Sequence, residues 1–352
     1  MASWQTYWRR PPPSTNTWSL WRMIRVSLVT RTRHFCKWLA GEARRHLILS
    51  LCVFVTLLFI NAAIYNYGCD YMSPPSIPVD MNSTHLNQFL IKEADFCHRQ
   101  TNLSFIVYIH SSLDNVEKRQ ETRLTWASAG LYDPSVRMAV VFMVGQAKNK
   151  YEEIILSEES HRYHDIVQGN YSDTYHMLSY KALSSLNWLT HHCSHVPWTI
   201  HADDDVLIDV FLMQKFLKNN GTQDSFFCYP WDKSSVRRHG KWCVRSNEYP
   251  EDMYPIYCAG GAWMVATPLV PRLLDAAGRV PIMWVDDVYL TGLLSKNAGI
   301  PISTSLKENI RTSDIYKEDL GKTMIWFNPG KPRTIWWYKL LSFHGYVSEI
   351  DV

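Results

Sequence analysis

A single apolar run, Leu47–Tyr65, divides the chain into two unequal parts. It contains no charged residue, and its length is close to the roughly 20 residues that a helix needs to cross a bilayer core. The residues before it carry nine Lys or Arg and one Glu. The positive-inside rule therefore predicts a cytoplasmic tail (1–46) and a signal anchor (47–67), with the rest of the chain in a lumen. A cleaved signal peptide is the alternative, but this leader is long for one.

Two features of the sequence after the apolar run are typical of an oxidising, glycosylating compartment. Asn-x-Ser/Thr sequons, each a weak signal alone, occur only there, at Asn82, Asn102, Asn170 and Asn220. The cysteines that follow the run are Cys69, Cys97, Cys193, Cys228, Cys243 and Cys258. Six cysteines allow up to three disulfides in fifteen pairings. They show no paired CxxC units, so a zinc site is not indicated.

The charge of the chain beyond residue 46 argues against nucleic-acid binding. That part holds 27 Lys or Arg against 32 Asp or Glu, so it is mildly acidic. A nucleic-acid-binding domain normally carries a basic footprint. We therefore expect no nucleic-acid partner.

Residues 68–103 contain several prolines and little periodicity, and we expect a lumenal stem there. From Ser104 to the C-terminus, β-rich runs alternate with amphipathic helical stretches. The expected strands are 104–110, 137–145, 164–168 and 198–205, and the expected helices are 116–129, 148–163 and 174–192. This alternation predicts an α/β domain over 104–352, with a mostly parallel sheet covered on both faces.

Asp203, Asp204 and Asp205 end one of these predicted strands. In open α/β sheets, ligands bind outside the carboxyl ends of the strands. Three adjacent carboxylates repel one another unless a cation or a donor network neutralises them. Mn²⁺ and Mg²⁺ favour such oxygen ligands together with substrate phosphates. We therefore interpret the triplet as a metal and nucleotide site; a solvated turn that caps the next helix is the alternative.

A second acidic pair, Asp286 and Asp287, precedes an apolar stretch with helical spacing. A helix N-terminus stabilises carboxylates, so the pair could be a simple cap. Alternatively, one carboxylate faces the cleft as a general base. Spacing alone does not choose between the two.

Between these acidic clusters lies the segment YPIYCAGGAWMVA (254–266). Gly260 and Gly261 permit a close approach of the backbone to a ligand. Trp263 could offer its ring face to a sugar. All three are therefore candidates for acceptor binding, although a tight turn entering a buried strand explains the segment equally well.

Together these segments resemble the β-1,3-galactosyltransferase family, which is family 31 of the glycosyltransferases and includes β-1,3-N-acetylglucosaminyltransferases. The resemblance covers about residues 104–350. It rests on ordered motifs: RQETRLTW (119–126), DIVQGNYSDTYHMLSYKAL (165–183), HADDDV (201–206), EYP (248–250), YPIYCAGGAWMVA (254–266) and DDVYLTG (286–292). It implies a Rossmann-like, GT-A-type nucleotide-sugar-binding domain behind the transmembrane helix.

The resemblance also implies roles for individual residues. Asp203 and Asp204 would bind the donor, and Asp205 would hold the metal. Arg123 and Lys181 match positions that line the family's donor pocket. These residues would form the donor side of the cleft.

The acceptor side is implied by the later motifs. Asp287 matches the catalytic Asp of the family's Glu-Asp-Val motif, and the Glu is replaced here by Asp286, which we assign to acceptor binding. His344, in FHGY (343–346), is a candidate second metal ligand or, alternatively, a surface histidine. The family's Asn-Leu-Thr is replaced by residues 176–179, which bears on donor preference.

The implied function is metal-dependent, inverting transfer of galactose from UDP-galactose to a glycan acceptor on a glycoprotein or glycolipid, in β-1,3 linkage. Asp287 would deprotonate the acceptor hydroxyl. UDP-N-acetylglucosamine is an alternative donor, and a non-catalytic lumenal chaperone or lectin on the same fold is the alternative from another class. The expected location is the Golgi membrane, as a single-pass type II protein.

Overall fold

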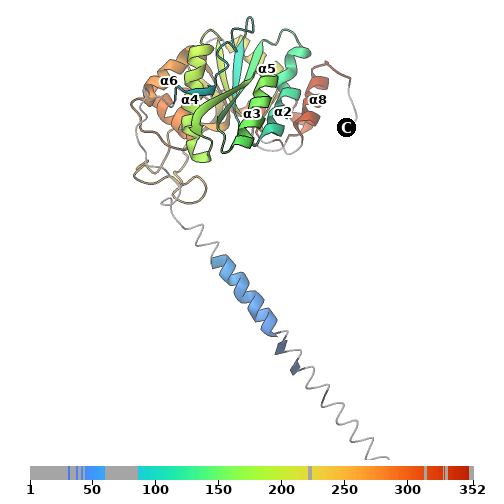
Figure 1. The fold of residues 1–352 in the computed structure, drawn as a ribbon, viewed down its shortest axis with the longest axis vertical. Helices are drawn as coiled ribbons and strands as arrows, with labels where there is room; N and C mark the ends of the chain where they lie inside the picture. The colour runs from blue at the N-terminus through green and yellow to red at the C-terminus, as the bar shows by residue number, and fades with distance from the viewer. Residues whose placement is uncertain are drawn as a thin grey trace, which may run out of the picture. The chain divides into compact units, whose positions relative to one another are not determined.

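The computed structural model describes residues 31, 37–38, 41–42, 44–59, 86–220, 224–312, 315–327, 329 and 332–348. The chain divides into two compact units, Met1–Tyr67 and Gly68–Val352, which are treated separately. In the first unit, residues 44–59 form a helix, drawn in blue in Figure 1. No helix in the described ranges has both the length and the apolar character needed to cross a membrane. The remainder of the apolar run and the Asn82 sequon lie outside the described residues.

The second unit is built on an eight-stranded sheet in the order β1-β4-β3-β2-β5-β8-β7-β9. The strands are β1 (Phe89–Ile91), β2 (Phe105–His110), β3 (Met138–Gln146), β4 (Ile166–Ser172), β5 (Trp198–Asp203), β7 (Phe226–Trp231), β8 (Tyr257–Ala266) and β9 (Ile302–Ser303). The strands β4, β3, β2 and β5 are parallel, whereas β1 and β8 join them antiparallel. The sheet is therefore mixed, with the predicted parallel strands at its centre.

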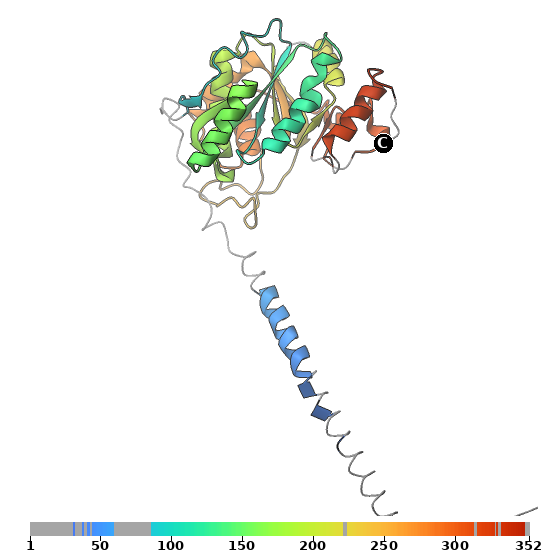
Figure 2. The same ribbon diagram turned by 45° about the vertical axis from the view of Figure 1, so that its right-hand side comes forward.

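The helices follow the strands in the expected alternation. They are α2 (Val116–Leu124), α3 (Lys150–Tyr163), α4 (Leu178–His192), α5 (Val210–Asn220), α6 (Val270–Ala277), α7 (Ser295–Ala298) and α8 (Arg333–Phe343). Short 3₁₀ or π-helical segments are η2 (Trp126–Leu131), η3 (Tyr175–Met177), η4 (Thr267–Leu269), η5 (Val288–Leu294), η6 (Lys307–Asn309) and η7 (Lys317–Asp319). The helix expected over 116–129 is thus divided into α2 and η2. Figures 1 and 2 show α2 and α3 side by side.

The order of the strands explains where a ligand can enter. The chain steps from β2 to β3 to β4 in one direction and then returns past β2 to form β5. Since such crossovers are right-handed, α2 and α3 cover one face of the sheet and α4 covers the other. The neighbouring strands β2 and β5 therefore form a topological switch point, the usual ligand crevice of open α/β sheets.

The folded unit begins before residue 104, which corrects the predicted stem boundary. Strand β1 pairs with β4, and Leu86 and Phe96 are buried in the core. Cys97 forms a disulfide with Cys193 at the end of α4. The stem is predicted from proline and polar content. This content does not reveal a short edge strand such as β1, which pairs with β4, or a disulfide to a distant cysteine.

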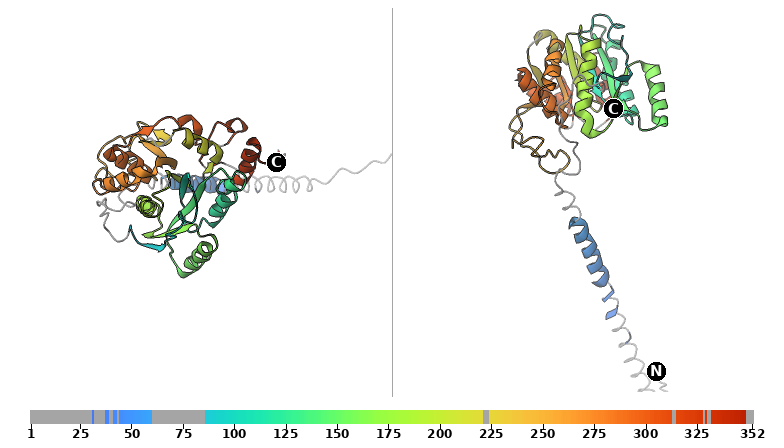
Figure 3. Two further views of the ribbon diagram at one scale, coloured as in Figure 1. Left: turned by 90° about the horizontal axis from the view of Figure 1, so that it is seen from above. Right: turned by 60° about the vertical axis from the view of Figure 1, so that its left-hand side comes forward.

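The C-terminal part adds a small sheet and a last helix. Strands β10 (Ile310–Arg311), β11 (Ile325–Trp326) and β6 (Leu207–Ile208) form a three-stranded sheet. Helix α8 docks on α2 through Arg333, which pairs with Glu121 at 2.9 Å and donates to Thr122. The view from above in Figure 3 shows the green N-terminal half of this unit beside its orange and red C-terminal half.

Candidate functional site

The acidic triplet lies at the switch point between β2 and β5. Asp203 is the last residue of β5 and pairs in register with His110, the last residue of β2. Asp203 lines a pocket of about 670 Å³ together with Gly260, Asp286 and Asp287. The structure therefore brings the two acidic clusters that were identified separately in the sequence to one cavity.

Asp204 is buried and held by three donors. Its carboxylate accepts hydrogen bonds from the Ser111 hydroxyl (2.7 Å) and the Asn115 amide (2.8 Å). The Lys118 ammonium donates to Asp204 at 3.0 Å and to Asp205 at 3.2 Å. Although burial opposes its charge, these two carboxylates raise the pKa of Lys118. Asp204 is thus an anchored residue that fixes the triplet, and none of its donors was identified from the sequence.

Asp203 and Asp205 are the members of the triplet that can reach a ligand. Their side chains are 48% and 44% exposed. Burial in the pocket and repulsion from neighbouring carboxylates, Asp286 first among them, raise the pKa of Asp203. Asp203 thus shares the pocket with the carboxylates of Asp286 and Asp287.

Lys181 lies close to the end of β2, and its role in donor binding stays a prediction. It projects from α4 and is buried, donating to the Ser111 carbonyl (2.8 Å) and the Asp173 carboxylate (2.6 Å). Burial lowers the pKa of Lys181, while the charge of Asp173 opposes that effect. Asp173, which sequence reasoning missed, stands in the same motif eight residues before it, and a buried lysine requires such a partner.

Asp286 and Asp287 stand at the start of η5, on the wall of the pocket. The Asp287 carboxylate accepts a hydrogen bond from the backbone N–H of Val288 at 2.8 Å. Burial, with repulsion from Asp286, raises the pKa of Asp287 to about 7. Burial raises the pKa of Asp286 to about 6. Because both raised pKa values lie near neutrality, a carboxylate of this pair is available as a base at neutral pH.

The backbone around Asp287 fixes its position. The Thr291 hydroxyl donates to the Asp287 carbonyl (2.6 Å) and accepts the Cys258 N–H (2.8 Å), which ties η5 to β8. At Gly260 a Cβ atom would lie 3.4 Å from the Asp287 carboxylate. Gly260 and Gly261 both line the pocket. Gly260 therefore leaves room beside Asp287, whereas a Cβ at Gly261 would meet the ring of Phe327 at 2.7 Å. The acceptor-binding role of the two glycines stays a prediction.

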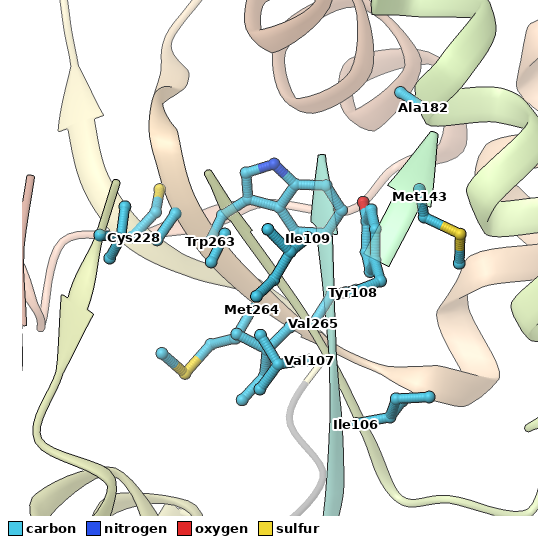
Figure 4. Packing of buried hydrophobic residues seen from close by; sticks show 14 of the residues in the cluster. Ile106, Val107, Tyr108, Ile109, Met143, Ala182, Cys228, Trp263, Met264 and Val265 are labelled. Carbon is cyan, nitrogen blue, oxygen red and sulfur yellow. The ribbon is translucent and has the colours of Figure 1, made fainter. Parts of the chain in front are cut away.

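Trp263 is a core residue, which corrects its predicted role in acceptor binding. It is 2% exposed and packs edge-on against Tyr108 of β2 and against Phe226. Figure 4 shows its ring among the apolar side chains of β2 and β8. Because both faces of this sheet are covered, the alternation of residues along β8 does not reveal which side chains face the cleft.

Exposed aromatic residues of the pocket wall take the place expected for Trp263. Trp231 and Trp242 are each 41% exposed and line the pocket, as does Tyr175. The Trp242 indole donates to the Tyr175 hydroxyl at 2.8 Å. They come from three separate places, the end of β7, the connection between β7 and β8, and η3, so no local pattern in the sequence brings them together.

Arg123 lies away from the acidic pocket, against the prediction that it lines the donor site. It pairs with Asp165 (2.8 Å) and Glu159 (2.8 Å), and its guanidinium lies over the ring of Tyr163. It lines a different pocket, also of about 670 Å³, between α2, α3 and α8. Arg123 therefore joins α2 to α3, and the side chain of α2 that reaches the triplet is Lys118.

His344 is not brought together with Asp205. Its ring lies 2.8 Å from the carboxylate of Asp209 and packs against Phe211. The Asp209 carboxylate also accepts hydrogen bonds from the backbone N–H groups of Phe211 and Leu212 at the start of α5. This arrangement joins α5 to the end of α8 and does not support the predicted role of His344 as a metal ligand.

Comparison with known proteins places these residues in a family. Residues 117–305 match the family model of Galactosyltransferase. This segment is more than half of the chain and contains the triplet and the Asp286–Asp287 pair. The chain belongs to the galactosyltransferase family. It therefore carries a glycosyltransferase domain, and His344 lies beyond the matched segment.

Individual relatives of this galactosyltransferase-family chain include two kinds of β-1,3-transferase. Beta-1,3-galactosyltransferase 2 of Homo sapiens is 28% identical over 61% of this chain and 52% of its own length. UDP-GalNAc:beta-1,3-N-acetylgalactosaminyltransferase 1 of Homo sapiens is 28% identical over 74% of this chain and 81% of its own length. The chain thus spans about half the length of the galactosyltransferase relative. The solved structure of the bifunctional glycosyltransferase WbbM aligns with a TM-score of 0.38 and 9% identity, covering 70% of this chain and 50% of that chain.

The oxygen ligands of this galactosyltransferase-family site fit a divalent cation bound jointly with a substrate. Within the described ranges, no three His, Cys, Asp or Glu side chains are grouped to hold a metal ion. Mg²⁺ and Mn²⁺ at phosphate sites require only one or two carboxylates and complete their shells with phosphate and water. The half-exposed carboxylates of Asp203, which lines the pocket, and of Asp205, two residues further along, can supply that donor set.

The described sequons differ in their surroundings. Asn102 is exposed, whereas the Asn170 amide donates to Gln88 at 2.6 Å and its carbonyl oxygen accepts from Gln146. Asn220 is half-buried at the end of α5 and donates to the Phe216 carbonyl. Of these three side chains, Asn102 is the most accessible to a glycan.

Proposed function

We propose that this chain transfers galactose from UDP-galactose to a hydroxyl of a sugar acceptor, forming a β-1,3 linkage with inversion at the anomeric carbon. The observation that carries the proposal is the shared pocket of Asp203 and the Asp286–Asp287 pair. It combines a strand-end acidic motif with a carboxylate whose pKa lies near neutrality. A binding protein has no need of a titratable base beside the reacting position.

Asp287 is the proposed general base. At neutral pH its raised pKa lets it accept a proton from the acceptor hydroxyl as that oxygen attacks the anomeric carbon. The bond from that carbon to the UDP oxygen breaks on the opposite side, so an α-linked donor gives a β-linked product. Asp286, whose carboxylate is its neighbour, would orient the acceptor and set the protonation of Asp287.

The donor lies, in this proposal, over the ends of β2 and β5. A divalent cation, Mn²⁺ or Mg²⁺, held by Asp205 and Asp203 would neutralise charge on the diphosphate. Lys118 is 41% exposed at this edge and can turn from the carboxylates towards a phosphate. Lys181 donates hydrogen bonds to the Ser111 carbonyl and the Asp173 carboxylate and so fixes both residues at this edge. This arrangement corresponds to a GT-A-type site.

UDP-N-acetylgalactosamine is the second candidate donor. It is supported by the relative named for that donor, which matches over 81% of its length. The replaced segment at residues 176–179 lies beside the pocket, where the ring of His176 is 4.7 Å from Trp284. Since donor selectivity depends on such wall residues, UDP-N-acetylglucosamine belongs in the same comparison.

We also propose that the enzyme is a type II protein of the Golgi membrane and acts on glycoprotein or glycolipid glycans. Its support is the basic tail before Leu47–Tyr65 and the sequons after it. The disulfides Cys97–Cys193 and Cys228–Cys258 agree with an oxidising lumen. Glycosidase treatment should shift the mobility of the expressed protein, and an unshifted band would contradict this topology.

Incubation of the full-length chain with each UDP-sugar, Mn²⁺ and an acceptor panel tests the activity. Release of UDP that depends on both acceptor and enzyme, with a β-1,3 product identified by NMR, is the expected result. Asp287→Asn provides the matched inactive control. Binding of UDP-sugars without transfer to any acceptor would instead favour a lectin or chaperone.

A further inference from the structure

The long connection between β7 and β8, residues 232–256, forms one wall of the pocket that contains Asp287. Arg237 and Trp242 of this connection line the pocket, together with Trp231 at the end of β7. Trp284, which also lines the pocket, donates its indole N–H to the Cys243 carbonyl at 3.2 Å. This contact holds the connection against the segment that carries Asp286 and Asp287.

Two cationic side chains of this connection lie over aromatic rings. The Arg237 guanidinium lies 4.7 Å from the Trp242 ring centroid. The Lys241 ammonium lies 4.7 Å from the Tyr175 centroid and 5.3 Å from that of Trp242. Among the ion pairs of the described residues, neither cation has a carboxylate partner. Their charges are oriented by the rings but not neutralised.

The pocket is therefore divided by charge. Asp203, Asp286 and Asp287 make one side acidic, and Arg237 makes the aromatic wall basic. Lys241, which is outside the pocket lining, adds a second positive charge beside Tyr175 and Trp242. A wholly neutral sugar would use the acidic side for its reacting hydroxyl and leave both cations unpaired. An arginine fixed over an aromatic ring is well suited to bind a carboxylate or sulfate.

We propose that this wall, formed by Trp231, Arg237 and Trp242 with Lys241 beside them, binds an anionic group on the acceptor. The acceptor class is then an acidic sugar, such as a uronic acid or a 6-sulfated hexose, whose ring stacks on the exposed indoles. The C6 group on C5 and the hydroxyl on C3 leave different carbons of the pyranose and point in different directions around the edge of the ring. The anion can thus face Arg237 while the hydroxyl faces Asp287. This inference rests on the proposed transfer reaction.

The position of the wall favours the acceptor over the donor as the source of the anion. Strand order places β2 on one side of β5 and β8 and β7 on the other. Lys118 and Lys181, the cations near the triplet, belong to elements that follow or pack on β2. Arg237 and Lys241 come from the β7 side. The diphosphate of the donor and the anion of the acceptor would thus meet separate cations.

Matched methyl glycosides test this inference with the full-length chain. The probes are methyl β-galactoside, its 6-sulfate and methyl β-galacturonide, each with a free 3-hydroxyl. We expect the two anionic probes to exceed the neutral one in kcat/KM by about 10-fold or more, as for a charge-assisted hydrogen bond. Arg237→Gln should remove this preference, and Arg237→Lys should retain part of it. Lys233→Gln, which removes an exposed charge from the same connection outside the pocket lining, should keep it.

Direct binding separates failure of this inference from failure of the proposed function. Calorimetric binding of the anionic glycosides that depends on Arg237 supports the site even if no sugar is transferred. Efficient transfer to the neutral glycoside, with no gain from sulfate or carboxylate, overturns the inference and leaves the transferase proposal standing. Loss of UDP affinity in Arg237→Gln, with acceptor binding unchanged, also overturns it, because the anion would then be the donor diphosphate.

Discussion

The Ser111 hydroxyl donates a 2.7 Å hydrogen bond to the buried carboxylate of Asp204, joining the ends of β2 and β5 at the switch point of the sheet. The same hydroxyl accepts from the Arg119 guanidinium at 3.0 Å. Ser111 thus connects the acidic triplet to the ion-pair network of α2 and α3. The position of Asp205 depends on this connection, because its neighbour Asp204 is fixed by it.

Ser111→Ala should destabilise the fold and weaken donor binding together. Asp204 would lose one of three donors in a buried position, at a cost of about 1.5–3 kcal/mol for a hydrogen bond to a charged group. Chemical denaturation measures the stability, and calorimetry measures UDP affinity. Ser112→Ala, at a neighbouring position whose hydroxyl makes no hydrogen bond to the triplet in the described contacts, is the control. An unchanged UDP affinity in Ser111→Ala would contradict the positioning role.

Arg123→Gln should reduce stability without reducing UDP affinity per folded molecule. The side chains of Arg123 and Glu159 are only 12% and 5% exposed, and breaking a buried pair costs about 3–5 kcal/mol. The exposed neighbour Arg162, changed to Gln, should have little effect. Thermal unfolding and UDP titration distinguish the two roles. A stable Arg123→Gln protein that no longer binds UDP would restore the donor-pocket assignment.

The raised pKa values of Asp286 and Asp287 predict opposite trends for activity and stability with pH. Transfer requires a deprotonated base, so kcat/KM should rise with pH through about 6–7. Stability should fall over the window from about 4 to 7, because the native state there holds protons that the unfolded chain has released. Asp287→Asn should therefore raise Tm at pH 7.5 relative to the parent, and the difference should shrink towards pH 4. Equal Tm differences at both pH values would contradict the elevated pKa.

Metal dependence has a readout independent of transfer. Asp205→Asn should weaken Mn²⁺ binding in the presence of UDP, followed by the paramagnetic resonance of free Mn²⁺, by about 10-fold or more, as for loss of one oxygen ligand. His344→Gln should leave that binding unchanged, because His344 pairs with Asp209. Chelation should abolish transfer, and Mn²⁺ or Mg²⁺ should restore it. If His344→Gln releases the metal, the structural assignment of this residue is wrong.

The strand-end position of the triplet could be predicted because it depends on local signals. The strand at 105–110 is a nearly continuous apolar run, whereas the strand at 198–203 also includes Thr199 and His201. The alternation of such strands with helices predicts the parallel centre of the sheet. A carboxylate directly after such a strand must lie at the ligand-binding edge. The pair Asp286–Asp287 was found in the same way, as acids before a helical stretch.

The parts that could not be predicted depend on contacts between distant segments. Whether Trp263 faces the core or the cleft is decided by what covers each face of β8. Arg123 and Lys118 are on the same helix, and only the packing of α2 determines which one meets the triplet. Strand β1 exists because it pairs with β4, and its short sequence has no pattern of its own.

Turnover and UDP affinity, measured side by side for Asp287→Asn and Asp286→Asn, test most directly whether Asp287 is the general base. Asn keeps the size of Asp but cannot take the proton. We therefore expect Asp287→Asn to lose about 10²–10⁴-fold in kcat with UDP affinity retained. Asp286→Asn should lose less, and Asp286→Glu should remain active. Normal turnover of Asp287→Asn beside an inactive Asp286→Asn would contradict the assignment.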